Sequence, residues 1–164
     1  MEIDTRHAIS QMLGRIPSGL SILTVRDGQD HETGMLVSWV QQAAFEPPLV
    51  TVAVNRERYV HEWLEQSQCA ALNLLGETHQ QFLSHFGKGF KPGESAFDDV
   101  PIQRGVTGVP LLSGALGYLE GRLAGKLPAG DHVIYLLEIV GAGVEPDFAT
   151  QRPLVHLRKN GFRY

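Results

Sequence analysis

Short apolar runs separated by polar turns recur along most of the 164-residue chain. Runs of this length, rich in Val, Ile, Leu and Thr, predict β-strands. The polar segments RDGQDHE (residues 26–32) and PAGDH (residues 128–132) have the composition of tight turns between neighbouring strands. The predicted strands are residues 18–25, 34–44, 48–54, 69–75, 109–113, 115–126, 132–144 and 153–158, with a last strand ending at Tyr164.

Apolar residues at helical spacing predict three short helices. Asp4 or Thr5 can cap the first helix, because a short polar side chain accepts a hydrogen bond from a free backbone N–H group. Thr78 and Gln81 form a capping box at the start of the third helix, which runs through Phe86. The first two helices are residues 5–14 and 56–66.

After the third helix, residues 87–108 show no regular period. A loop of this length in a compact domain tends to be functional or mobile. The alternative is a solvated surface excursion, and the pattern leaves both readings open. Many short strands and few helices predict a mostly β fold, a β-barrel with peripheral helices. Because neither a repeat nor a linker interrupts the pattern, we expect a single domain of residues 1–164.

The composition argues against several classes of protein. A net charge of −4 disfavours non-specific nucleic-acid binding, which needs a basic face. No apolar run approaches the roughly 20 residues of a membrane-spanning helix, and the start MEIDTRHAIS lacks the pattern of a signal peptide. Cys69 is the single cysteine, so there is no internal disulfide bond. We therefore expect a cytoplasmic protein with an inert thiol.

Two arginines, Arg56 and Arg58, fall in the first turn of the second predicted helix, where acidic residues are normally favoured. With Asn55 as the cap, the free N–H groups and two guanidinium groups would suit a phosphate. The alternative is a solvated pair neutralised by Glu57 and Glu62. Neither GxxxxGK[ST] nor GxGxxG occurs, so this is neither a P-loop nor a Rossmann phosphate site.

The segment GMLVSWVQQAAF (residues 34–45) is a predicted strand whose apolar run is interrupted by Ser38, Gln41 and Gln42. A planar heterocycle lying on this strand could use its backbone groups together with Ser38 and Gln41. The alternative is a strand whose polar residues face water or a subunit partner.

His132 stands at the start of a strand, directly after the turn residues Gly130 and Asp131. It could contact an anionic cofactor or orient a substrate, or it could be an ordinary surface or capping residue. The seven histidines show neither HxxxH nor HExxH spacing and no CxxC occurs, so we expect no metal site. A GxSxG nucleophile elbow is also absent.

Taken together and in order, several segments resemble the flavin reductase-like, FMN-binding split-barrel family from about Met12 to Tyr164. They are RIPSGLSILTV, GMLVSWVQQAAFEPPLVTVAVNRERYVHEWL, CAALNLLGE, HFG, GYLEGRL, GDHVIYLLEIVGAGV and PLVHLRKNGFRY. The resemblance implies a split β-barrel with peripheral helices and a homodimer that binds flavin near its interface. It implies an NAD(P)H-dependent reductase of FMN, or of FAD, that supplies reduced flavin to a partner oxygenase or another acceptor.

The resemblance also assigns residues. It places the isoalloxazine and ribityl groups on residues 35–41, the phosphate at residues 55–61, and the nicotinamide or flavin face near His132. It brings Arg163 and Tyr164 towards a partner subunit's site. The expected cofactor-binding residues are Met35, Leu36, Val37, Ser38, Trp39, Gln41, Asn55, Arg56, Arg58, Tyr59, His61, His85, Phe86 and His132. No residue is expected to act as an essential nucleophile.

Two departures from the family pattern stand out. Leu36 replaces a frequent threonine, and Tyr59 and Val60 replace hydroxyl residues, so phosphate binding would rely on arginine and backbone groups. Other readings are a non-catalytic FMN-binding electron-transfer flavoprotein, a haem-binding barrel with His61, His85 or His132 as axial ligand, and an interaction module without cofactor. The sequence leaves open NADH or NADPH, FMN or FAD, bound or exchanging flavin, and the electron acceptor.

Overall fold

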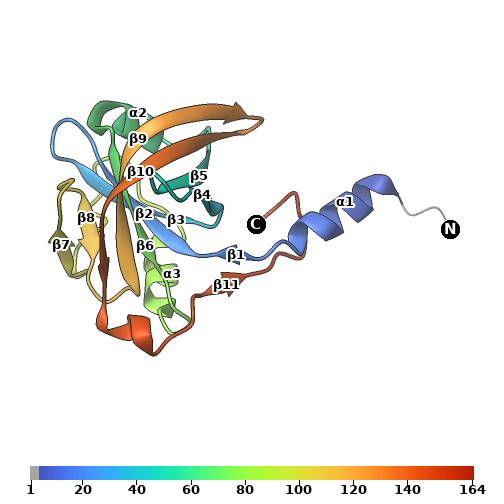
Figure 1. The fold of residues 1–164 in the computed structure, drawn as a ribbon. Helices are drawn as coiled ribbons and strands as arrows, with labels where there is room; N and C mark the ends of the chain where they lie inside the picture. Colours follow the sequence, from blue (N-terminus) through green and yellow to red (C-terminus); the bar gives the residue numbers. More distant parts are fainter. Residues whose placement is uncertain (1–3) are drawn as a thin grey trace.

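The computed structural model describes residues 4–164, so the first three residues of the expected domain lie outside the described residues. Short helices lie around a set of antiparallel strands (Figure 1). The helices are α1 (Thr5–Gly14), α2 (Val60–Ser67), α3 (Gln80–Phe86) and the 3-10 turn η1 (Pro146–Ala149). The strands are β1 (Ser18–Gly19), β2 (Ser21–Arg26), β3 (Glu32–Val37), β4 (Val40–Ala44), β5 (Leu49–Asn55), β6 (Cys69–Leu74), β7 (Ile102–Arg104), β8 (Pro110–Leu112), β9 (Gly117–Ala129), β10 (His132–Val144) and β11 (Val155–His156).

The main sheet has seven strands in the order β3-β2-β6-β9-β10-β5-β4, and every pair in it is antiparallel. β3 and β4 are consecutive in the chain yet lie at opposite edges of this sheet. Two residues, Ser38 and Trp39, connect them, so the sheet must curl until its edges meet. This is a split barrel with peripheral helices, and the predicted fold class is confirmed.

The inside of the curled sheet is filled by aliphatic residues of β2, β5, β6 and β10, together with Tyr135. The α2 helix closes this core with Val60, Trp63 and Leu64, which are nearly inaccessible. Burial of such side chains is the main source of stability. Within residues 4–164, no helix is both long and apolar enough to cross a membrane.

The start of α2 corrects one prediction. The helix begins at Val60 with Tyr59 at the cap position, so Arg56 and Arg58 precede it and do not lie in its first turn. The Asn55 side chain accepts a hydrogen bond from the Glu57 backbone N–H (2.9 Å), and the Arg58 N–H donates to the Asn55 carbonyl (3.1 Å). Asn55 therefore closes a tight turn rather than capping the helix, since its side chain bonds two residues ahead.

Other boundaries also differ from the prediction. The predicted capping box is wrong, because α3 starts at Gln80 after His79 and has no side-chain cap. The strand predicted for residues 34–44 is divided into β3 and β4, and no strand reaches Tyr164. The predicted loop 87–108 contains β7, which pairs with β8.

Part of that loop packs against α3, around Phe90, Ala96 and Phe97, whereas residues 91–95 are exposed. Ala96 is fully buried, and the Ala96 carbonyl accepts a hydrogen bond from His85 Nε2 at 2.7 Å. Phe90 and Phe97 pack against the same cluster, which is centred on Phe82 and Phe86. The solvated-excursion alternative is therefore wrong for the stretch around Ala96 and fits the exposed residues 91–95.

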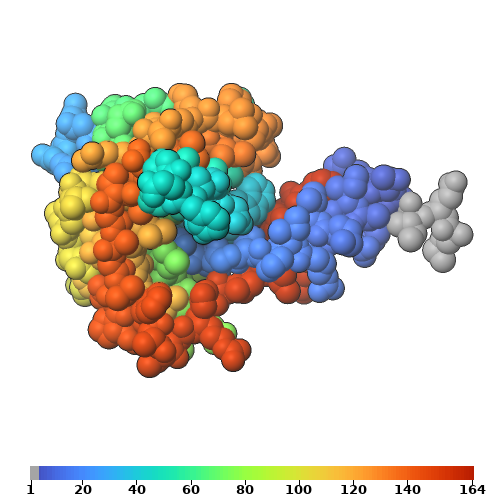
Figure 2. All heavy atoms as spheres, in the orientation of Figure 1, coloured from blue at the N-terminus to red at the C-terminus, as the bar shows by residue number. Residues whose placement is uncertain are grey.

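We use the term arm for α1 together with residues 155–164, which stand away from the sheet (Figures 1 and 2). Its two parts are tied together by backbone hydrogen bonds from Arg158 N to Gly14 O (3.0 Å) and from Gly161 N to Ser10 O (2.8 Å). The predicted Asp4 cap of α1 is confirmed, because its carboxylate accepts from the Arg6 N–H. The C-terminal end of the arm returns to the barrel.

Candidate functional site

A cavity of about 380 Å³ opens where the barrel is split. One wall is the end of β3, with Met35, Leu36 and Val37, and the opposite wall is the end of β5, with Ala53 and Val54. A drug-sized ligand typically occupies 300–1,000 Å³, so the cavity has room for one planar ring system.

The connection between β3 and β4 creates this opening. Ser38 and Trp39 belong to no strand, and the Trp39 carbonyl accepts a hydrogen bond from the Ala53 N–H at 3.0 Å. Before this point β3 pairs only with β2, and after it β4 pairs with β5. The polar interruption in GMLVSWVQQAAF thus marks the place where the chain leaves one sheet edge for the other. Alternate backbone groups of the free β3 edge remain for a ligand.

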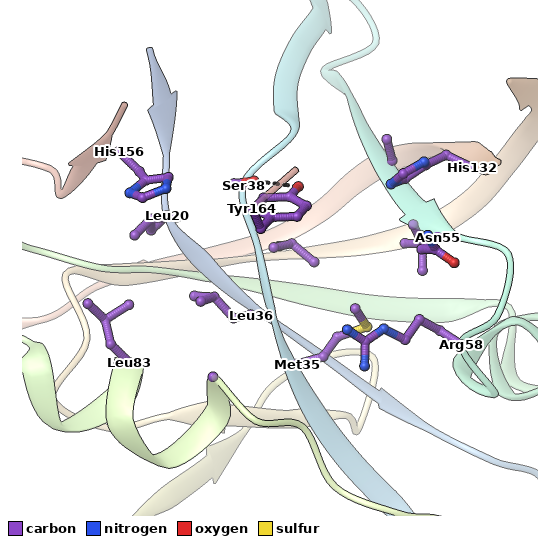
Figure 3. A pocket seen from close by; sticks show the side chains of 14 residues that line it. Leu20, Met35, Leu36, Ser38, Asn55, Arg58, Leu83, His132, His156 and Tyr164 are labelled. Carbon is purple, nitrogen blue, oxygen red and sulfur yellow. Dashed lines mark hydrogen bonds between the residues drawn. The ribbon is translucent and has the colours of Figure 1, made fainter. Parts of the chain in front are cut away.

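Polar side chains reach the cavity from the end of β5, from the turn after it and from the start of β10. They are Asn55, Arg58 and His132, and Ser38 joins them from the β3–β4 connection (Figure 3). Among residues 4–164, no carboxylate lies within 4.0 Å of the Arg58 guanidinium. Arg58 is exposed and points into the cavity, so it can bind an anion there.

His132 is held in place at the cavity wall. Its Nδ1 lies 2.7 Å from Asp131 Oδ1, and its ring centroid is 4.7 Å from that of Trp39. The hydrogen bond from His132 lowers the pKa of Asp131, and the charge on His132 acts in the same direction. The Asp131 carboxylate is thus ionised at neutral pH and fixes the orientation of the imidazole ring.

Three predicted residues lie beside the cavity rather than in its lining. Arg56 is not in the cavity lining: its Nε donates to the His132 carbonyl at 3.4 Å, and it lines a neighbouring surface depression that Arg58 also borders. Trp39 packs behind His132. Gln41 is exposed on β4.

Tyr59 and His61 are engaged in contacts that fix the fold. The Tyr59 hydroxyl donates to the Phe90 carbonyl at 2.8 Å, which ties α2 to the loop. His61 Nε2 donates to the Asn55 carbonyl (2.7 Å), and Nδ1 lies 2.6 Å from the Tyr135 hydroxyl, from which it accepts in the neutral tautomer. Burial raises the pKa of Tyr135, with a further contribution from Glu65, so this hydroxyl remains a donor.

His85 and Phe86 lie on α3 next to the cavity without lining it. His85 binds the Ala96 carbonyl, and Phe86 is only 1% exposed within the second core cluster. Within the described chain, no three His, Cys, Asp or Glu residues form a metal-binding group. Burial raises the pKa of the Cys69 thiol, so this thiol stays protonated at neutral pH.

Sequence reasoning missed several lining residues that come from distant parts of the chain. No local pattern identifies them, because the fold alone brings them together. Tyr164 lines the cavity of its own chain, and its approach to a partner subunit's site stays a prediction. The other missed residues are Leu20, Ala53, Val54, Leu83, Gly87 and His156.

Known proteins match the chain over nearly its full length. A family model described as "Flavin reductase like domain" matches residues 13–163. A "Putative diflavin flavoprotein A 3" from Synechocystis sp. is 39% identical over 156 residues, which cover 94% of this chain and 25% of that protein. A "Putative diflavin flavoprotein A 5" from Nostoc sp. is 37% identical over 158 residues, which cover 95% of this chain and 27% of that protein. The chain spans about a quarter of the length of these relatives.

Solved structures share the fold. The NADH:FAD oxidoreductase SgcE6 of Streptomyces globisporus superposes with a TM-score of 0.82 at 25% identity, over 96% of this chain and 92% of that one. The flavin reductase PheA2 superposes with a TM-score of 0.76 at 22% identity and 94% coverage of both chains. The second match concerns the fold alone.

Proposed function

The chain belongs to the flavin reductase-like family, and from this premise we propose that it is an NAD(P)H-dependent flavin reductase whose flavin binds in the cavity of the split barrel. The observation that carries this proposal is the cavity itself, a slot between β3 and β5 with apolar walls and Arg58 beside it. We propose FMN as the flavin, with FAD as the alternative, and release of reduced flavin to a partner oxygenase or another acceptor.

The residues present suit a flavin. Leu20, Leu36, Val37 and Leu83 provide apolar surface for a planar ring, and the free edge of β3 provides backbone donors and acceptors. Arg58 supplies positive charge for a phosphate. When bound, the flavin accepts a hydride from the nicotinamide, and the protein contributes position and electrostatics.

Each group of the chain then has one task. The β3 backbone from Met35 to Val37 orients the ring system, and its N–H groups stabilise negative charge that develops during reduction. Arg58 and Asn55 hold the phosphate end. His132, fixed by Asp131, orients the nicotinamide nucleotide against the exposed ring face. Holding the reacting atoms about 3–3.5 Å apart accounts for much of the rate acceleration.

Replacing His132 with alanine should raise the KM for NADH roughly two- to tenfold, the equivalent of one hydrogen bond. The expected change in FMN affinity is small, because the phosphate and the ring are held by other residues. Steady-state NADH oxidation with excess FMN measures the effect. His31→Ala, at an exposed turn, is the control. An unchanged KM in His132→Ala would remove His132 from the nucleotide site.

The assay for the activity itself is oxidation of NADH and of NADPH, each with FMN and with FAD in excess. We expect absorbance at the nicotinamide band to fall only when both flavin and protein are present. This matrix also identifies the preferred nicotinamide and flavin. No flavin-dependent oxidation with any combination would refute the reductase proposal.

The relatives favour a second candidate. Because they are diflavin flavoproteins of which this chain spans about a quarter, the domain could serve as an FMN-binding electron-transfer unit in a larger flavoprotein. Such a unit binds flavin tightly but is reduced by NAD(P)H only slowly without its partner. Retained flavin together with negligible NAD(P)H oxidation would select this candidate.

We further propose a homodimer. The arm exposes apolar side chains on both of its parts, and these would be covered by a second copy. They are Ile9, Met12, Leu13, Val155, Leu157 and Phe162, and the exposed Ile16 lies just beyond the end of α1. Sedimentation at micromolar concentration should give twice the mass of the chain.

A further inference from the structure

A tyrosine from the arm forms one wall of the cavity. The Tyr164 hydroxyl lies 2.9 Å from Ser38 Oγ, across 126 positions of sequence. Figure 3 shows this contact directly, with the Tyr164 ring beside Ser38. The Tyr164 ring centroid is 5.7 Å from that of Trp39. The residue therefore contacts both residues at which β3 and β4 diverge.

Arg158 holds this ring in place. Its guanidinium carbon lies 5.2 Å from the Trp39 ring centroid and 5.5 Å from the Tyr164 ring centroid, which are cation–π distances. Arg158 is itself anchored, because its Nη1 donates to the Gly161 carbonyl at 3.1 Å and its backbone N–H binds Gly14. Contacts with both the barrel and the arm thus define the position of Tyr164.

We propose that Tyr164 is a flavin-contacting residue, and that its ring is an aromatic wall against which the isoalloxazine ring packs. This inference rests on the proposed flavin site. Although its hydroxyl is bonded, Tyr164 is 77% exposed, so a ligand in the cavity could cover its ring. Two aromatic rings in offset-stacked or edge-to-face contact are more stable than an aromatic ring packed on an aliphatic side chain with the same buried area.

The contact with Ser38 does not compete with the flavin. A serine hydroxyl carries one donor and two acceptor positions, and Tyr164 uses only one of them. Ser38 is 6% exposed, so its position is fixed by the surrounding chain. It can therefore hold Tyr164 and still bind a polar atom of the ring system.

The test compares FMN dissociation constants of variants. Tyr164→Leu should weaken FMN binding about three- to tenfold, because the aromatic contact is lost. Tyr164→Phe keeps the ring and should stay within about twofold of wild type. The matched control is Phe148→Leu, an exposed aromatic residue of η1 that neither lines the cavity nor belongs to the proposed dimer surface. It should bind FMN as wild type does.

Fluorescence of the bound FMN gives a second readout. A tyrosine ring in contact with the excited flavin donates an electron and quenches its emission, whereas leucine and phenylalanine do not. Emission per bound flavin should therefore rise in both Tyr164 variants and stay unchanged in Phe148→Leu. Unchanged affinity and emission in Tyr164→Leu would overturn the inference, as would equal losses of affinity in Tyr164→Leu and Phe148→Leu.

These outcomes are separable from failure of the proposed function. Wild-type protein is titrated with FMN first, and absence of binding would refute the proposed flavin site itself. Normal wild-type binding with no effect of Tyr164→Leu would refute only the aromatic wall.

Discussion

Replacing Arg58 with alanine should weaken FMN binding tenfold or more and leave riboflavin binding unchanged. Arg58 reaches the cavity with no carboxylate partner among the described residues, so a phosphate is the anion that it would bind. Losing one charge-assisted hydrogen bond costs about 1.5–3 kcal/mol, which corresponds to roughly ten- to a hundredfold in Kd. Because Arg58 is exposed, the lower end of this range is expected.

Riboflavin and Arg56 supply the controls for this prediction. Riboflavin has the same ring and ribityl chain without the phosphate, so any effect of Arg58→Ala on it would indicate damage to the cavity. Arg56→Ala should change FMN affinity less than twofold, since Arg56 binds the His132 carbonyl and does not line the cavity. Equal losses of FMN affinity in the two variants, measured by fluorescence titration, would contradict the assignment to Arg58.

Replacing Asn73 with alanine should lower the free energy of unfolding by about 2–4 kcal/mol. Asn73 is fully buried and joins three strands. Its Nδ2 donates to the Ile22 carbonyl (3.0 Å) and to Thr24 Oγ1 (3.2 Å), and its Oδ1 accepts from the Leu112 N–H (2.8 Å). Truncation removes these three buried hydrogen bonds and leaves the Leu112 N–H without the acceptor that it uses here, which accounts for the size of the effect.

Thermal unfolding measures this loss. For a chain of this size the Tm should fall by roughly 5–15 °C. Gln42→Ala is a suitable control, because Gln42 is exposed on β4 and bonds only to a neighbouring carbonyl. A Tm within 2 °C of wild type for Asn73→Ala would mean that water or rearrangement satisfies the freed groups, contrary to the packing seen here.

Hydrophobic periodicity predicted much of the fold, because most strands are bounded by clear turn residues. The 132–144 strand matches β10 at both ends, and helix 5–14 matches α1. The errors lie where a side chain forms hydrogen bonds with backbone groups other than those that the local pattern predicts. Asparagine is a common helix-capping residue, but the carbonyl and side chain of Asn55 close a turn, so α2 starts later than predicted.

The candidate site was only partly predictable, for a different reason. Met35 to Ser38, Asn55, Arg58 and His132 were identified through local motifs and the family resemblance, and they do line one cavity. Whether they bind flavin stays a prediction. Choosing between Arg56 and Arg58 required knowing which way each side chain leaves the turn. Tyr164 required the long-range contact between the arm and the barrel, which no local pattern encodes.

The central claim is that the cavity holds a flavin that NAD(P)H reduces, and one anaerobic titration tests it most directly. The protein is incubated with FMN, freed of unbound flavin, and its visible spectrum is recorded before and after NADH is added. We predict a bound oxidised-flavin spectrum that bleaches rapidly. A protein that retains no flavin and also fails to accelerate NADH or NADPH oxidation with excess FMN or FAD would contradict the account.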